Sequence, residues 1–152
     1  MRKGDGTQYL EAIYKYFADD FLLNRPRFKG KPVVLGSNQL VAGKEQTFWH
    51  VISEGAIEEK RAPNLRRCER IRWPKAIIGH AGDPSIKIWE NERKGWIRTL
   101  LWLETSDYLV VLTVKPTYYQ LWTAYLLYGE QNRQALRKEY EAWTKAEAAR
   151  HE

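Results

Sequence analysis

Four apolar segments joined by short connections lie between residues 86 and 128, and they constrain the fold more than any other feature. The segments cover residues 86–91, 96–104, 107–114 and 118–128 and are rich in the β-branched and aromatic residues that favour strands. The connections, residues 92–95, 105–106 and 115–117, are too short for the crossover that parallel neighbours need. The pattern therefore predicts consecutive hairpins in an antiparallel sheet.

Helical patterns flank this predicted sheet. Residues 7–23 carry apolar side chains at spacings of three and four, and the pre-proline Arg25 is disfavoured in a helix. Residues 131–149 form a charged segment, in which one apolar stripe is expected to be buried, namely Leu136, Tyr140 and Trp143. Both segments are predicted to be helices.

The segments between these helices and strands are less regular. Residues 31–35 are compatible with a short strand, and residues 47–53 favour a strand, with a helix as the alternative. Residues 62–79 predict a helix that begins at Pro63 and restarts near Pro74.

The order of these elements predicts a single α+β domain over residues 1–152. We expect a mainly helical part over residues 1–80, an antiparallel twisted sheet of four to five strands over residues 86–128, and a C-terminal helix over residues 131–149.

Composition narrows the class of protein. Hydrophobic residues make up 43% of the chain, which is enough for a core, and the single cysteine, Cys68, excludes an internal disulfide framework. We find no apolar run of the roughly 20 residues that span a bilayer and no signal peptide, so we expect a cytoplasmic protein without a membrane partner. The excess of 25 Lys and Arg over 19 Asp and Glu favours a nucleic-acid partner, and a solvated basic surface is the alternative.

The connection lengths also predict the two faces of the sheet, because side chains alternate along a strand. A two-residue turn at 105–106 places Arg98 opposite Thr113, and a three-residue loop at 115–117 places Thr113 opposite Tyr119. One face is then expected to be core: Ile97, Leu101, Leu103, Tyr108, Val110, Leu112, Val114, Tyr118 and Trp122. The other face carries Trp96, Arg98, Leu100, Trp102, Thr113, Tyr119, Leu121, Thr123 and Tyr125.

The polar side chains on this second face suit the floor of a cleft, since a buried polar group needs a partner. A half-exposed face with ordinary polar side chains is the alternative. Among the three histidines, His50 lies inside an aromatic segment and is the candidate catalyst, with a structural role as the alternative.

Several classes of chemistry lack their motifs. The sequence has no clustered His or Cys for a metal, no glycine-rich phosphate loop and no Gly-x-Ser-x-Gly hydrolase motif, so we expect neither metal nor cofactor. The remaining set of His, Arg, Tyr and Thr suits metal-free cleavage of RNA. In that reaction a base takes the 2′-OH proton, an acid protonates the leaving 5′-oxygen, and a cation stabilises the transition state.

Four segments carry a resemblance to a known group of nucleases. They are residues 47–51 (TFWHV), 66–71 (RRCERI), 107–112 (DYLVVL) and 118–125 (YYQLWTAY). On these segments, residues 45–128 resemble the phage-encoded and toxin-type nucleases of the Barnase–EndoU–colicin–RelE superfamily. The resemblance implies helices before a small antiparallel sheet, and metal-independent cleavage of RNA by a phage or toxin module.

The resemblance also implies roles for individual residues. His50 would be the general acid or base, Arg98 would stabilise the transition state, and Thr123 and Tyr125 would position or protonate the scissile phosphate. The backbone of RNA or another nucleic acid would contact Arg66, Arg67, Arg70, Lys87 and Lys94, and bases would stack on Trp89, Trp96 or Trp102.

Two other functions remain open at this point. The same basic face would serve a nucleic-acid-binding domain without catalysis. The other alternative is an interaction protein of a mobile element. The toxin interpretation is also compatible with a neutralising protein partner.

Overall fold

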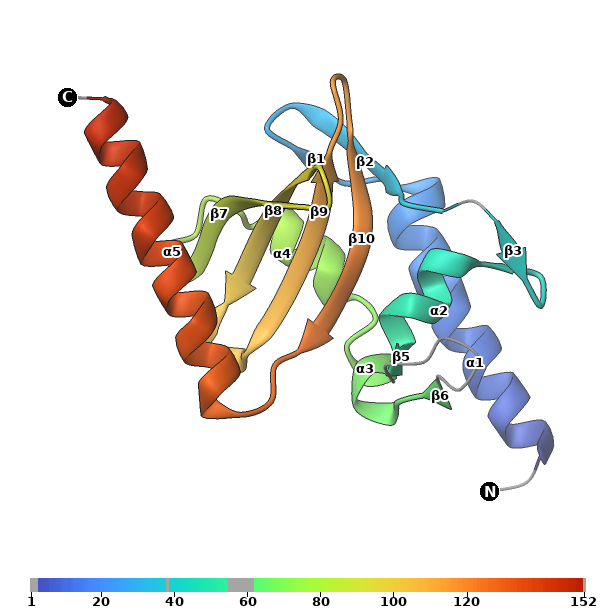
Figure 1. Ribbon diagram of the computed structural model, residues 1–152. Helices are drawn as coiled ribbons and strands as arrows, with labels where there is room; N and C mark the ends of the chain where they lie inside the picture. The colour runs from blue at the N-terminus through green and yellow to red at the C-terminus, as the bar shows by residue number, and fades with distance from the viewer. Residues whose placement is uncertain (1–2, 38, 55–61, 152) are drawn as a thin grey trace.

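The computed structural model describes residues 3–37, 39–54 and 62–151 and has an α+β fold (Figure 1). Its main sheet has six strands in the order β1-β2-β10-β9-β8-β7. Four of them come from the C-terminal half: β7 (Ile86–Arg93), β8 (Trp96–Leu103), β9 (Tyr108–Val114) and β10 (Tyr119–Leu126). They pair antiparallel as consecutive neighbours, in agreement with the hairpin pattern.

The other two strands come from the N-terminal half, which makes the sheet larger and mixed rather than purely antiparallel. β1 (Arg27–Phe28) and β2 (Lys31–Leu35) form a hairpin, and β2 adds to the edge of β10 in the parallel direction. This addition corrects the predicted sheet of four to five antiparallel strands. Parallel pairing between segments so distant in the chain leaves no signal in the local sequence of either strand.

Helices cover both faces of the sheet. α1 (Lys3–Ala18), a π-helical turn η1 (Asp19–Leu23), α2 (Gln46–Ile52) and α4 (Trp73–Gly79) pack on the first face, and α5 (Glu130–Arg150) packs along β7 on the second. Figure 1 shows α5 running diagonally beside the sheet, with its C-terminal end beyond the strands. The smaller elements are the pairs β3 (Leu40–Val41) with β4 (Lys44–Glu45) and β5 (Ser53–Glu54) with β6 (Ala62–Pro63), the helix α3 (Leu65–Glu69) and the 3-10 turn η3 (Glu104–Ser106).

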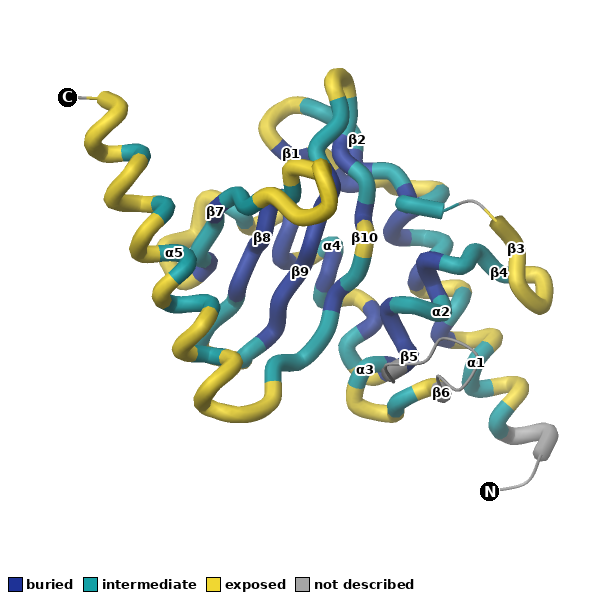
Figure 2. The backbone as a smooth tube through the Cα atoms, in the orientation of Figure 1, coloured by how far each residue is buried: buried dark blue, intermediate teal, exposed yellow. Residues whose placement is uncertain are grey.

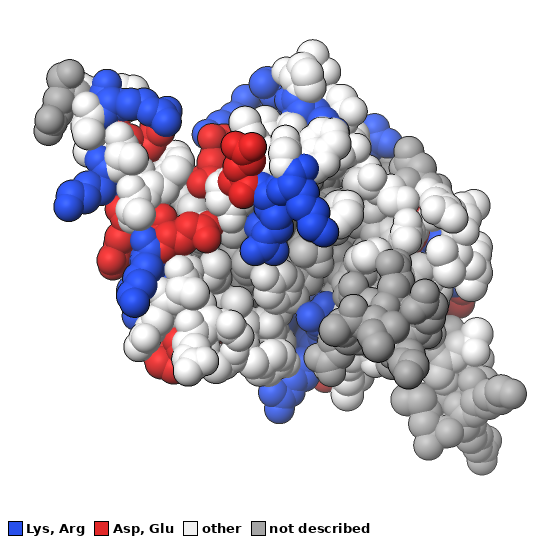
Figure 3. Space-filling model, in the orientation of Figure 1, with Lys and Arg blue, Asp and Glu red and all other residues white. Residues whose placement is uncertain are grey.

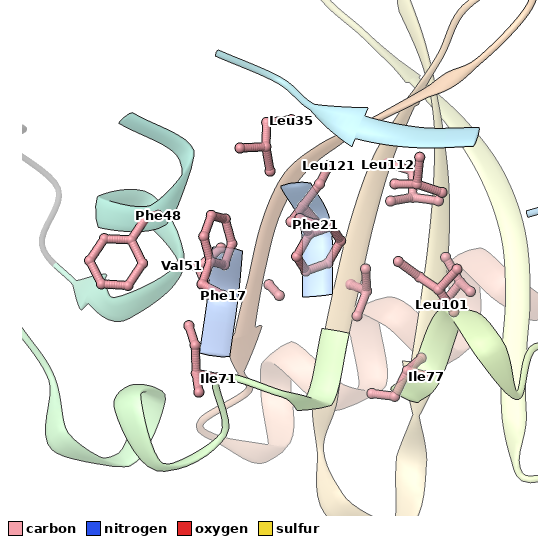
Figure 4. Packing of buried hydrophobic residues seen from close by; sticks show 14 of the residues in the cluster. Phe17, Phe21, Leu35, Phe48, Val51, Ile71, Ile77, Leu101, Leu112 and Leu121 are labelled. Carbon is pink, nitrogen blue, oxygen red and sulfur yellow. The ribbon is translucent and has the colours of Figure 1, made fainter. Parts of the chain in front are cut away.

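The larger hydrophobic cluster lies between the first face and the N-terminal helices (Figure 4). Phe17 and Phe21 from the first helical segment are fully buried against Phe48, Leu101 and Leu121. A smaller cluster lies on the second face under α5. It consists of Trp89, Leu100, Trp102, Leu109 and Val111, and the predicted stripe Leu136, Tyr140 and Trp143 packs against it. Figure 2 shows the buried central strands between these two layers.

Two segments differ from their predicted secondary structure. Residues 47–53, favoured as a strand, lie mainly in the helix α2, because Phe48, Val51 and Ile52 then share one buried side. Residues 62–79 do not form one helix: Ala62 and Pro63 pair with β5, and the helix is split into α3 and α4. Asn64 begins α3 by accepting a hydrogen bond from the Arg67 backbone N–H at 3.1 Å.

The register of β8 against β9 agrees with the prediction, since Leu100 lies opposite Val111 and Arg98 lies opposite Thr113. The register of β9 against β10 does not: Thr113 lies opposite Gln120, because the connecting loop is one residue longer than predicted. Tyr119 and Leu121 therefore belong to the first face and its core, contrary to the prediction.

A β-bulge at Trp122 restores the predicted side for the rest of β10. Leu121 pairs with Leu112, whereas Thr123 pairs with Val111, so Trp122 is the extra residue. Thr123 and Tyr125 thus lie on the second face with Arg98, as predicted. Trp122 is half exposed rather than in the core, and Ile97 at the start of β8 is also exposed.

Candidate functional site

The second face of the sheet is only partly covered by α5, and its uncovered end forms a hollow of about 490 Å³. The hollow spans β8, β9 and β10, with Thr113 and Gln120 at neighbouring positions of the sheet. Its lining consists of Arg93, Lys94, Trp96, Arg98, Thr113, Lys115, Gln120 and Trp122. We call this site the basic hollow.

The basic hollow is lined by four cationic side chains and by no Asp or Glu of the described residues. None of the four, Arg93, Lys94, Arg98 and Lys115, forms an ion pair within residues 3–37, 39–54 and 62–151. Figure 3 shows Lys and Arg atoms gathered over the end of the β7–β8 hairpin, with acidic atoms set further toward α5. Such a concentration of unpaired positive charge favours an anionic ligand.

Two exposed indoles flank these charges. Trp96 begins β8 with 53% of its surface exposed, and Trp122 at the bulge is 52% exposed. The Lys115 ammonium lies 3.6 Å from the centre of the Trp96 ring, a close cation–π contact. Aromatic and cationic groups therefore lie together in the lining of the basic hollow.

Arg98 is held in place by a chain of hydrogen bonds that ends on α5. Its Nε donates to Asn91 Oδ1 at 3.1 Å, and Asn91 Nδ2 donates to Glu139 Oε1 at 2.7 Å. Burial lowers the pKa of Arg98, and the charge of Arg93 lowers it further. The guanidinium nonetheless stays protonated, and its two Nη groups make no hydrogen bond within the described part of the chain, so they are available to an anion.

Tyr125 lies on the same face, toward α5, and packs against the second hydrophobic cluster. The Arg67 guanidinium carbon lies 5.7 Å from the centre of its ring. Burial raises the pKa of Tyr125, and the charges of Arg98, Arg93 and Arg67 oppose this increase only in part. The phenol is therefore protonated at neutral pH and can donate a hydrogen bond or a proton, but is a poor base.

His50 comes from α2, on the other side of Trp122. It lines a separate hollow of about 310 Å³ together with Trp49 and Ser53, outside the basic hollow. The His50 and Trp122 rings are 6.1 Å apart between centroids, so Trp122 connects the two hollows. His50 is partly exposed, and its ring is not sealed in the core.

Arg67 ties the His50 side of the site to Tyr125. Its Nη1 donates to the backbone oxygen of Ser53 and, at 3.4 Å, to that of His50. The cap at Asn64 sets the start of α3 and hence the position of Arg67. Arg67 thus contacts both His50 and Tyr125, and Trp122 lies beside His50 and lines the hollow that contains Arg98. The four residues predicted to be catalytic do not line a single hollow.

The predicted nucleic-acid contacts have different environments. Lys94 lines the basic hollow and Arg66 is exposed on α3, whereas the Arg70 guanidinium lies 5.1 Å from the centre of the Trp73 ring. Lys87 forms an ion pair with Glu104 at 3.1 Å and lies near Tyr140 of α5. Lys87 therefore helps to hold α5 on the sheet and does not line the basic hollow.

The three tryptophans predicted to stack on bases also differ in their exposure. Trp89 and Trp102 are fully buried under α5, which excludes base stacking on them, and Trp96 alone of the three is exposed. Sequence reasoning missed Arg93, Lys115, Gln120 and Trp122 as members of the site. The hairpin pattern places Arg93 next to a turn, but the position of the bulge at Trp122 carries no such signal.

No group of three or more His, Cys, Asp or Glu side chains suited to a metal ion occurs among residues 3–37, 39–54 and 62–151. Within the same ranges, no helix combines the length and apolar character needed to cross a membrane. No protein-family model, curated protein or solved structure matches the chain.

Proposed function

We propose that the protein is a metal-independent endoribonuclease that cleaves RNA on the second face of its sheet. The observation that carries this proposal is the arrangement around the β10 bulge: Arg98, Thr123 and Tyr125 share one face, and the His50 ring lies beside Trp122. The set contains a proton acceptor, a proton donor and a cation next to a basic hollow.

The reaction would use the 2′-OH of the substrate as the nucleophile. His50 takes the proton of that hydroxyl while its oxygen bonds to phosphorus, and the bond from phosphorus to the 5′-oxygen breaks. Tyr125, which burial keeps protonated, gives its proton to the leaving 5′-oxygen. The products are a 2′,3′-cyclic phosphate and a free 5′-hydroxyl.

Arg98 and Thr123 would act on the phosphate rather than on the protons. The Arg98 Nη groups stabilise the charge that grows on the non-bridging oxygens, and the Thr123 hydroxyl positions the phosphate. Arg67, whose guanidinium lies over the Tyr125 ring, orients that ring and is a positioning residue.

A second candidate function is nucleic-acid binding without cleavage. The separation of His50 from the basic hollow favours it, because binding needs only the unpaired cations and the exposed indoles. The two functions differ in whether the RNA chain is broken.

The test is incubation of the purified protein with mixed single-stranded RNA in excess EDTA, followed by gel analysis and identification of the product ends. We expect cleavage that EDTA does not reduce, with cyclic phosphate ends. His50→Ala and Tyr125→Phe should each lower the rate by roughly 10²–10⁴-fold, the usual contribution of a general acid or base.

His80→Ala and Tyr128→Phe are the matched controls, because both side chains are exposed and lie outside the site. Both variants should cleave at the unaltered rate. Cleavage abolished by EDTA would contradict the metal-independent mechanism, and cleavage unaffected by His50→Ala would remove His50 from it. Binding without cleavage would select the second candidate.

A further inference from the structure

The basic hollow lies beside the proposed catalytic groups and contains residues that the proposed reaction does not use. Lys115, Trp96 and Trp122 have no part in proton transfer, yet all three are arranged around one concave site. We propose that this hollow is the subsite that binds an unpaired stretch of the RNA chain, with bases stacked on Trp96 and Trp122 and phosphates bound by Lys115, Arg93 and Arg98. This inference rests on the proposed function and adds a preference for single strands.

The stacking part of the inference follows from the exposure of the two indoles. Trp89 and Trp102 on this same face are fully buried, whereas about half of the surface of Trp96 and of Trp122 is exposed beside the hollow. Trp96 and Trp122 belong to β8 and β10, which flank β9, and the register places Trp122 three to four positions further along the strands, so their backbones are roughly 15 Å apart. Both indoles therefore border the hollow from opposite sides and present surface on which bases can stack.

The phosphate-binding role of the hollow is supported by the lack of carboxylate partners for its cations among the described residues. Elsewhere in the described part of the chain, Lys87, Arg72, Arg133 and Arg137 each have a carboxylate partner. The cations of the basic hollow have none and repel one another, as the effect of Arg93 on the pKa of Arg98 indicates. A bound phosphate would relieve this repulsion and supply the missing negative charge.

The preference for unpaired RNA follows from the shape of the site. In a duplex the flat faces of the bases are already stacked, so they are not available to a protein ring. α5 covers the other part of the same face, and the remaining 490 Å³ suits a small ligand rather than the side of a duplex. The Thr113 hydroxyl and the Gln120 amide make no hydrogen bond within the described residues, so they can contact base edges or sugars.

The test measures binding without cleavage, using a fluorescein-labelled single-stranded RNA in which every 2′-OH is methylated. Fluorescence anisotropy gives the Kd for the unaltered protein and for two variants. We expect Trp96→Ala to raise the Kd roughly tenfold and Trp96→Phe to restore most of the affinity, because a ring is retained. Lys115→Gln should reduce the slope of log Kd against log salt by about 0.7.

Matched controls come from the same strand and from α5. Ile97→Ala alters the exposed neighbour of Trp96 on the other side of β8, and Lys145→Gln removes an exposed cation far from the hollow. Both should leave the Kd within about twofold. Thermal unfolding of each variant checks that the fold is retained.

Three outcomes would overturn the inference: equal affinity for the annealed duplex, equal affinity for inorganic polyphosphate of the same charge, or an unchanged Kd in Trp96→Ala. Failure of the proposed cleavage is a separate result, because the methylated RNA cannot be cut. Tight, Trp96-dependent binding without cleavage of unmodified RNA would support this subsite and reject the nuclease function.

Discussion

Gly36 allows β2 to approach β10 closely, because it has no Cβ. A Cβ at this position would lie 2.8 Å from the backbone oxygen of Leu121, which already accepts a hydrogen bond from the Gly36 N–H at 2.9 Å. The obstructing atom belongs to the backbone of a central strand, so it cannot rotate away. The parallel contact between the two halves of the chain therefore requires glycine.

Gly36→Ala is accordingly expected to destabilise the protein by about 1–3 kcal/mol, the usual range for overpacking. Urea unfolding of the variant and the unaltered protein measures the difference.

Gly79→Ala is the matched control for this prediction. Gly79 ends α4, and a Cβ there would meet nothing within 4 Å. This variant should be unchanged or more stable by up to about 1 kcal/mol. Equal effects of the two substitutions would show that space beside Leu121 is not limiting.

At the scale of elements, α5 both covers the second cluster and holds the site in place. Glu139 Oε1 accepts hydrogen bonds from Trp89 Nε1 at 2.8 Å and from Asn91 Nδ2, and Asn91 in turn holds Arg98. Ion pairs add a second attachment, because Glu104 contacts both Lys87 of β7 and Arg137 of α5. The helix therefore determines where the Arg98 guanidinium lies.

Glu139→Ala is expected to lower the free energy of unfolding by about 1–3 kcal/mol, since it leaves the buried Trp89 N–H without its acceptor. Chemical denaturation followed by circular dichroism measures this loss. Glu139→Gln retains a carbonyl acceptor and should cost less.

Glu141→Ala, at an exposed position of the same helix, is the control and should change stability by less than about 0.5 kcal/mol. The prediction would fail if both alanine variants lost the same stability. Glu139→Ala should also weaken the proposed binding of RNA, because Asn91 no longer fixes Arg98.

At the scale of the whole molecule, the two hydrophobic clusters share their strands. Leu101 and Val110 face the first cluster, while Leu100 and Val111 on the same strands face the second. Loss of either cluster exposes one side of β8 and β9 and removes support from the other. The two layers are thus expected to unfold together, as one domain.

Urea unfolding should therefore give a single transition. Far-UV circular dichroism reports the helices of both layers, and tryptophan fluorescence is sensitive to the buried Trp89 and Trp102 of the second cluster. The two signals should have coincident midpoints. Separate midpoints would mean that the α5 layer unfolds independently.

The sequence by itself was sufficient for the local parts of this structure. Alternation of apolar and polar residues and the short connections predict the strands β7 to β10 and the pairing of Arg98 with Thr113. The helical spacing of apolar residues predicts α5. These features depend on neighbours in the chain, so their signals are written within a few residues. Placing Arg98, Thr123 and Tyr125 on one face was also possible, although the β9–β10 loop and the bulge at Trp122 each shifted the register by one residue.

The tertiary structure alone decided the rest. It placed β2 beside β10, made residues 46–52 a helix, engaged the half-buried Lys87 in an ion pair beside α5, and brought Lys115 and Trp122 to the rim of the basic hollow. Each of these depends on which surfaces are buried between segments far apart in the sequence. Burial is a property of the packed whole, and it outweighs the weak preference of any single segment for helix or strand.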